Sequence, residues 1–120
     1  MEMADKADAF SVFQLIETFR EIHPEMPMQM AAVFLLIAMK PGISQAELLR
    51  VMDISQPGMS RNVIALTAIN RHGAPGLDLV EQQPAPHDAR ITVLQLTAKG
   101  RAFLERLLAV WRRGDVEIRV

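Results

Sequence analysis

The sequence has 120 residues, 50% of them hydrophobic, and a formal net charge of −1. This length provides for one domain with a modest core, and leaves little for a second. The absence of cysteine excludes disulfides, thiolate metal sites and thiol nucleophiles, and three scattered histidines make a poor metal site.

The charges are unevenly distributed along the chain. Residues 1–39 carry two basic and six acidic groups, whereas residues 40–113 carry ten basic and six acidic groups. Such asymmetry is expected when one part of a domain faces an anion and another part faces solvent or a partner. Chance scatter of the charges is the alternative interpretation.

The first predicted helix begins near Asp8, a suitable N-cap, and runs to about Ile22. His23-Pro24 ends it, because the residue before a proline is displaced from the helical region. Apolar residues recur at three- and four-residue steps on one face of this helix: Val12, Phe13, Ile16 and Phe19.

Residues 28–39 are almost all apolar, which predicts a helix buried on most sides. At this length the segment is too short to span a bilayer, and the acidic N-terminus does not resemble a secretory signal. We therefore expect a cytoplasmic protein without membrane contact. Lys40-Pro41-Gly42 then interrupts the chain.

Two short helices follow, separated by a tight turn. The run from Ser44 to Glu47 is a capping box, which predicts a helix to about Met52. Ser55 then caps a second helix to about Ile69, with a proline tolerated in its first turn. Its inward face is expected to hold Met59, Val63 and Leu66, with Gln56, Ser60, Arg61 and Ala65 on more exposed sides.

A hairpin and a last helix complete the predicted elements. Residues 71–76 form a loop by composition, residues 77–83 and 90–96 form two strands, and residues 84–88 form an unpaired projecting connection. Thr97 caps a final helix to about Arg113, where Gly114 ends it. Phe103, Leu104, Leu107, Leu108 and Trp111 form its apolar stripe, and the alternation of Val116, Ile118 and Val120 beyond it is weak.

The hairpin region carries a resemblance to a known family. Leu79-Val80, then Pro84 to Arg90 in the pattern Pro-x-x-x-Asp-x-Arg, then Leu96-Thr97-Ala98-Lys99-Gly100, resemble the wing of MarR-family winged-helix regulators without a gap. Glu47-Leu48, Ile54-Ser55 and Ser60-Arg61 also fit that family's helix-turn-helix. The resemblance covers roughly residues 28–108.

The resemblance implies a mainly α fold with a small β-hairpin (α+β), a winged helix-turn-helix. Residues 1–120 would form a single DNA-binding domain whose N- and C-terminal helices serve dimerisation. Three departures accompany the resemblance: Asn70 stands where the family has a glycine before an apparently inserted loop, the wing tip has few basic residues, and the chain ends soon after its fifth helix.

The second helix of the helix-turn-helix is expected to enter the DNA major groove. Short polar residues and an Arg near its N-terminus suit base edges and phosphates. The candidates are Ser55, Gln56, Pro57, Gly58, Ser60, Arg61 and Asn62. Ordinary caps and solvated polar side chains are the alternative, and Gly58 can simply be a small residue in the first turn.

In the predicted wing, Arg90 resembles the family arginine that enters the adjacent minor groove. Asp88, two residues earlier, would point to the same side of the hairpin and orient Arg90. Without the longer motif, the pair is an ordinary surface salt bridge. Lys99 is a candidate for phosphate contact, with a solvated helix start as the alternative.

The expected function is sequence-specific binding of double-stranded DNA in transcription regulation, as a homodimer. The dimer surface is predicted to include Phe10, Phe13, Phe19, Leu104, Leu108 and Trp111. No catalytic motif or cofactor site is recognised, so an enzyme is not expected. A winged-helix module that binds another protein is the rival hypothesis.

The family also implies a small-molecule effector, which the sequence does not identify. A Met-rich second helix (Met26, Met28, Met30, Met39) is a candidate lining for its pocket, with core packing as the alternative.

Overall fold

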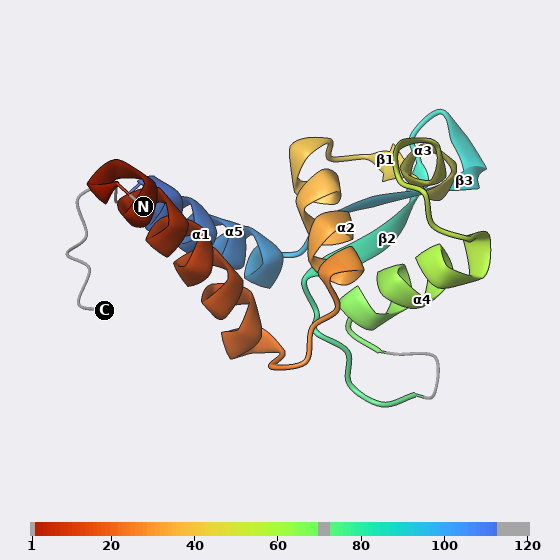
Figure 1. Cartoon of the computed structure of the whole chain (residues 1–120). Coiled ribbons are helices and arrows are strands. Elements are labelled where there is room, and N and C mark those ends of the chain that lie inside the picture. The colour runs from red at the N-terminus through yellow and green to blue at the C-terminus, as the bar shows by residue number, and fades with distance from the viewer. Residues whose placement is uncertain (1, 70–72, 113–120) are drawn as a thin grey trace.

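The computed structural model describes residues 2–69 and 73–112 (Figure 1). These residues form the mainly α winged helix-turn-helix predicted from the sequence. In chain order the elements are α1 (Met3–Ile22), α2 (Met28–Met39), β1 (Ile43–Ser44), α3 (Gln45–Val51), α4 (Gln56–Leu66), β2 (Val80–Ala85), β3 (Asp88–Leu96) and α5 (Ala98–Arg112).

Helices α1 and α5 pack side by side at one end of the molecule, away from the helix-turn-helix and the hairpin (Figure 1). A cluster of three aromatic rings joins this pair to α2. The ring of Phe103 lies 5.4 Å from that of Phe19 and 5.6 Å from that of Phe34, centroid to centroid. Offset and edge-on contacts of this kind stabilise a core beyond the area they bury. The end helices are therefore continuous with the main core.

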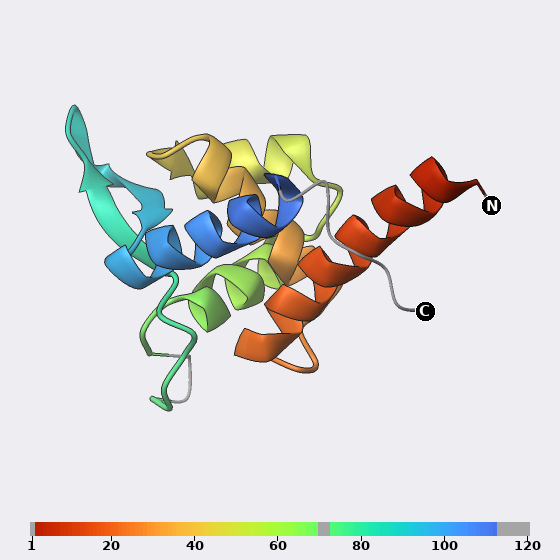
Figure 2. The same ribbon diagram turned by 90° about the vertical axis from the view of Figure 1, so that its left-hand side faces the viewer.

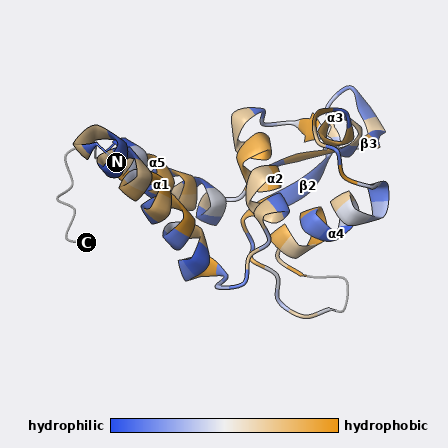
Figure 3. Ribbon diagram, in the orientation of Figure 1, coloured by the Kyte–Doolittle hydropathy of each residue, from blue (hydrophilic) through white to orange (hydrophobic). Residues whose placement is uncertain are grey.

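Helix α2 occupies the centre of the fold and is hydrophobic along most of its length (Figure 3). Val33, Phe34 and Ile37 are fully buried, because α4 and β3 pack on this side. The expectation of burial on most sides is wrong for the opposite side, where Met28 is 81% exposed and Leu35 is also exposed. An apolar stripe thus remains uncovered in the part of the chain that the structure describes.

Two helix boundaries differ from the predictions. Helix α1 begins at Met3, so Asp8 lies inside it and is not its cap. Helix α4 ends at Leu66 and not near Ile69, because Thr67 has an extended backbone and its hydroxyl donates to the Ile64 carbonyl at 2.6 Å. The structure confirms the extent of α2 as predicted and the capped starts of α3, α4 and α5.

The sheet has the strand order β1-β3-β2, all antiparallel. Strand β1 was not predicted; it pairs Ile43 with Leu94, far along the chain. Residues 84–88 are not an unpaired connection: β2 continues to Ala85, which pairs with Asp88. Pro84 is tolerated because β2 is an edge strand and its register shifts at this position. The hairpin projects from the helical body as the wing (Figure 2).

Several predictions fall outside the described residues, namely those on Asn70, on residues 71–72, on the end of the last helix at Arg113 and Gly114, and on the tail with Val116, Ile118 and Val120. Within residues 2–69 and 73–112, no helix combines the length and hydrophobicity that crossing a bilayer requires.

Candidate nucleic-acid interface

The start of α3 is held by the capping box that the sequence predicted. The Ser44 hydroxyl accepts a hydrogen bond from the Glu47 amide at 3.1 Å, and the Glu47 carboxylate accepts one from the Ser44 amide at 3.2 Å. Lys40 pairs with the same carboxylate. This ammonium, together with the Ser44 amide, lowers the pKa of Glu47. The Glu47 carboxylate therefore caps the start of α3 and is at the same time paired with the Lys40 ammonium.

The first turn of α4 is open to solvent. The Ser55 hydroxyl accepts a hydrogen bond from the Gly58 amide at 3.1 Å and caps the helix, and Ser55, Gln56 and Pro57 are exposed. A Cβ on Gly58 would lie 3.0 Å from the Ser55 hydroxyl oxygen and 3.1 Å from a methyl group of Ile54. A side chain at this position would therefore crowd the Ser55 cap and Ile54.

Arg61 is an exposed cation on α4. It lies one turn into α4, its side chain is exposed, and the described part of the chain offers it no hydrogen bond or ion pair. Ser60 beside it is half-buried, and the Gln45 side-chain amide donates to its hydroxyl at 2.8 Å. This contact ties α3 to α4 and leaves the Ser60 hydrogen free to donate. Gln45 was not among the residues predicted for this surface, because nothing local to either helix indicates its contact with Ser60.

Asn62, expected among the surface residues, is only 8% exposed. Its amide donates to the Gly58 carbonyl at 3.1 Å and to the Gln29 side chain at 3.5 Å. The spacing could have indicated this burial, because Asn62 follows Met59 by three residues and precedes Leu66 by four, which places it on the inward face. The structure therefore separates Asn62 from the exposed start of α4.

At the wing, Asp88 and Arg90 form a two-point ion pair. The Nε and Nη2 atoms of Arg90 each donate to a different oxygen of Asp88 at 3.0 Å, and the Arg90 amide donates to the same carboxylate at 3.0 Å. The Arg90 guanidinium and amide lower the pKa of the Asp88 carboxyl, and Asp88 raises the pKa of Arg90. Arg90 still has 90% of its side chain exposed, against 25% for Asp88. The carboxylate thus orients the guanidinium and leaves it accessible.

The start of α4 and the tip of the wing both lie at the end of the molecule away from α1 and α5 (Figure 1). Lys99 is less free than expected: its ammonium donates to the Leu77 carbonyl at 3.0 Å. Arg101, one turn into α5, similarly donates to the Leu96 carbonyl at 3.1 Å. Among the described residues of the helix-turn-helix and the wing, Arg50 on α3 and Arg61 on α4 are exposed without a hydrogen bond or ion pair, and the exposed Arg90 has Asp88 as its side-chain partner.

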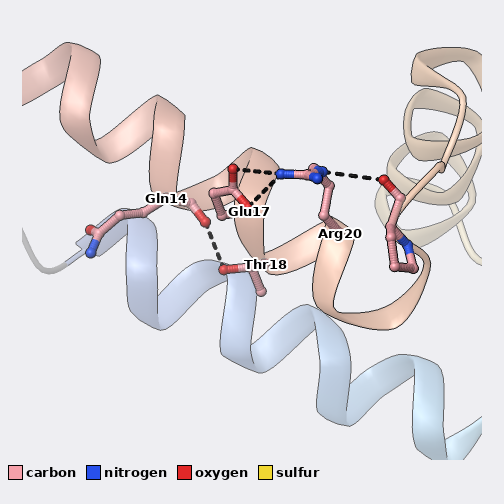
Figure 4. Close-up of polar contacts among 5 residues, drawn as sticks. Gln14, Glu17, Thr18 and Arg20 are labelled. Carbon is pink, nitrogen blue, oxygen red and sulfur yellow. Dashed lines mark hydrogen bonds and ion pairs between the residues drawn. The ribbon is translucent and has the colours of Figure 1, made fainter.

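A groove of about 460 Å³ runs between α1 and α2. Its lining includes Ile16, Phe19, Arg20, Met26, Met28 and Leu35. Arg20 lies at its edge with its guanidinium occupied by the Glu17 carboxylate, at 2.8 Å, and by the Pro24 carbonyl, at 3.2 Å (Figure 4). Of the methionines expected to line a pocket, Met26 and Met28 do so, whereas Met30 is buried in the core and Met39 lies outside the groove.

The sequence matches no protein-family profile and no curated protein. Solved structures do match. Wild-type MarR from E. coli, in its apo form, is 18% identical over 94% of this chain and 78% of that one, with a TM-score of 0.59. BpsR of Bordetella bronchiseptica, whose DNA binding is regulated by 6-hydroxynicotinic acid, is 17% identical over 88% and 71%, at 0.58. A probable transcriptional regulator from Pseudomonas aeruginosa is 20% identical over 89% and 75%, at 0.58. The chain therefore has the MarR-type winged-helix fold.

Proposed function

We propose that this chain, which has the MarR-type fold, is a sequence-specific, double-stranded DNA-binding transcriptional regulator that acts as a homodimer and not as an enzyme. One observation supports this above the others: α4, with an exposed Arg61 that has no partner among the described residues, and the wing, with an exposed Arg90 held in place, project at the same end of the molecule. Two cations on two projecting elements suit two neighbouring grooves of one duplex.

Helix α4 would enter the major groove with its first turn. Ser55 and Gln56 present short polar groups there, and Arg61 suits either a base edge or a flanking phosphate. Ser60 keeps its O–H free to donate, because its contact with Gln45 uses only an acceptor lone pair of its oxygen. Phosphate oxygen and guanine N7 and O6 are suitable acceptors for this O–H.

The wing would place Arg90 in the adjacent minor groove. A guanidinium has five N–H donors, and the pair with Asp88 uses two of them through the side chain, which leaves three for DNA. Asp88 is then an orienting residue, and it also reduces the net charge of the wing. Binding by Arg90 would depend on groove width more than on base identity.

The experiment compares Arg61→Ala and Arg90→Ala on duplexes selected from a random library with the unmodified protein. Arg61→Ala should cost about 1–3 kcal/mol of binding free energy for a base contact and relax the preference at one position of each half-site. A phosphate contact would instead weaken all sequences alike. Arg90→Ala should weaken binding most on A·T-rich flanks.

Arg112→Ala is the matched control, since it removes one exposed arginine at the opposite end of α5 from the wing. It should leave the affinity and its salt dependence unchanged. Thermal melts establish that each variant is folded. If both Arg61→Ala and Arg90→Ala are folded and bind duplexes as the unmodified protein does, the protein-binding module becomes the better hypothesis.

The groove between α1 and α2 is the candidate site for a small-molecule effector, because its volume lies in the usual range for ligand pockets and its lining is largely apolar. We expect a ligand of this kind to be small and mainly apolar. A rise in melting temperature with small apolar aromatic compounds checks this, and no rise with any of them would count against it.

A further inference from the structure

Residues 76–79 connect the end of α4 with the start of α5. They precede β2 in the chain, but their backbone groups pair with both helices. On the α4 side there are four backbone hydrogen bonds: Gly76 to Ala68 (2.9 Å), Leu77 to Ala65 (3.1 Å), Asp78 to Thr67 (3.2 Å) and Leu79 to Leu66 (2.8 Å), each from amide to carbonyl. Two of these bonds, to Ala65 and Leu66, satisfy carbonyls that the end of α4 otherwise leaves without partners, and the other two hold the residues that follow the helix.

On the α5 side the same segment accepts three hydrogen bonds. The Thr97 amide donates to the Leu79 carbonyl at 3.1 Å, the Thr97 hydroxyl to the Asp78 carbonyl at 2.7 Å, and the Lys99 ammonium to the Leu77 carbonyl at 3.0 Å. The Thr97 hydroxyl also accepts from the Gly100 amide at 2.9 Å. One hydroxyl thus caps α5 and attaches it to the segment that holds α4.

The contacts on both sides are close enough to prevent sliding. A Cβ on Gly76 would lie 2.0 Å from the Thr67 carbonyl oxygen, and a Cβ on Gly100 would lie 2.0 Å from the Leu79 carbonyl oxygen. Asp78 has a φ of 56°, in the left-handed region that non-glycine residues rarely adopt. A conformation of this kind persists only where the surroundings over-determine it.

The other attachment of α4 is of a different kind. Met59, Val63 and Leu66 bury apolar side chains in the core, and apolar burial is non-directional. It keeps α4 on the domain but tolerates small shifts. Hydrogen bonds require particular distances and angles. Residues 76–79 therefore determine where α4 lies relative to α5.

We infer that residues 76–79 couple the recognition helix rigidly to α5, and that Thr97 is the positioning residue of this connection. The inference rests on the proposed function, in which α1 and α5 form the dimer and α4 reads a half-site. In such a dimer the connection sets the distance and angle between the two copies of α4. Lys99, whose ammonium lies on the Leu77 carbonyl, belongs to the connection as well.

Thr97→Val tests the inference, because valine has the shape of threonine without the hydroxyl; Thr97→Ser, which keeps the hydroxyl, is the matched control. Three selected duplexes are compared: a single half-site, two half-sites at the preferred spacing, and the same two with base pairs inserted between them. Thr97→Val should bind the single half-site within about twofold of the unmodified protein, while its preference for the correct spacing falls by about fivefold, the effect of one neutral hydrogen bond. Thr97→Ser should keep the full preference.

An unchanged spacing preference in folded Thr97→Val would overturn the inference, as would an equal loss on all three duplexes. Lys99→Met separates the two roles of that residue. A positioning role again reduces only the spacing preference, whereas a phosphate contact weakens every duplex and lowers the salt slope by about one.

Amide hydrogen exchange of the DNA-free protein gives a readout that needs no duplex. The amides of residues 76–79 should exchange faster in Thr97→Val than in the unmodified protein or in Thr97→Ser. Equal rates in all three would show that Thr97 does not hold the connection. If the unmodified protein binds none of the duplexes, the proposed function fails and the role in half-site spacing fails with it, whereas exchange alone still decides whether the connection exists.

Discussion

At the wing tip, Asp88 and Arg90 are more important for orientation than for stability. Both groups lie at the surface, where an ion pair contributes little to the free energy of unfolding because solvent screens it. The two-point geometry nevertheless restricts the guanidinium, which costs less entropy to order on binding than a free side chain would. The Arg90 guanidinium is thus already oriented before DNA binds.

The low pKa of the Asp88 carboxyl gives this pair a testable pH dependence. The Arg90 side chain and amide stabilise the carboxylate, so its contribution to stability is present above the ordinary pKa of aspartate and is lost as the pH falls through the lowered one. We expect no change near neutral pH. A carboxyl NMR titration should find the pKa of Asp88 below the ordinary value, and Arg90→Ala should return it toward that value. An Asp88 pKa that Arg90→Ala leaves unmoved contradicts the pair.

The chain enters α5 through the pattern Leu-Thr-x-x-Gly, and each of the three named positions has its own structural role. Leu96 is buried at the end of β3, Thr97 caps the helix, and Gly100 lets the helix start lie against the backbone of Leu79. Three unrelated physical requirements therefore meet in five residues. This explains how a short motif predicts a tertiary contact.

Gly100→Ala should destabilise the domain. In a solvent-exposed helix the change would gain about 1 kcal/mol from helix propensity. Here the added Cβ would lie 2.0 Å from the Leu79 carbonyl oxygen, so backbone must shift. Overpacking a tight site costs about 1–3 kcal/mol, so the net effect is a loss of stability.

Denaturant unfolding measures this effect. Ala102→Gly, on the exposed side of the same helix, is the reference for propensity alone and should lose about 1 kcal/mol. A gain in stability for Gly100→Ala would mean that the close contact with Leu79 does not exist.

At the scale of the whole molecule, α1 and α5 expose large apolar side chains that a partner would cover. Phe13 on α1 is 54% exposed and Trp111 on α5 is 57% exposed. Of the residues expected at a dimer surface, Phe19 lies instead in the core, and Phe10, Leu104 and Leu108 are half-buried. Exposed aromatic residues on packed helices are typical of association surfaces in many proteins. The homodimer through α1 and α5 stays a prediction.

Phe13→Glu should convert the dimer to a monomer, because a carboxylate placed in an apolar interface loses its hydration without a partner. Light scattering at micromolar concentration gives the mass. Val51→Glu, at an exposed apolar site on α3, is the control and should leave the mass unchanged. A dimer with two-fold symmetry would bind an operator of two half-sites about 10 base pairs apart. A monomer mass for the unmodified protein would refute both the dimer and this operator.

Short-range patterns in the sequence determined the helices, the caps at Ser44, Ser55 and Thr97, and the hairpin, because caps and helical periodicity act between residues a few positions apart. The same patterns sufficed for the winged-helix fold and the exposed side of α4. The wing motif even predicted the contact of Asp88 with Arg90, two residues apart.

Only the tertiary structure decided how distant segments meet. The pairing of Ile43 with Leu94, the exposed stripe of α2 and the attachment of Thr97 to residues 76–79 join parts of the chain that lie about 20 to 50 residues apart or depend on which faces are covered. No local propensity encodes such contacts, since they form between groups that are unrelated until the core brings them together. For that reason the contact of Lys99 with the Leu77 carbonyl could be described only from the folded chain.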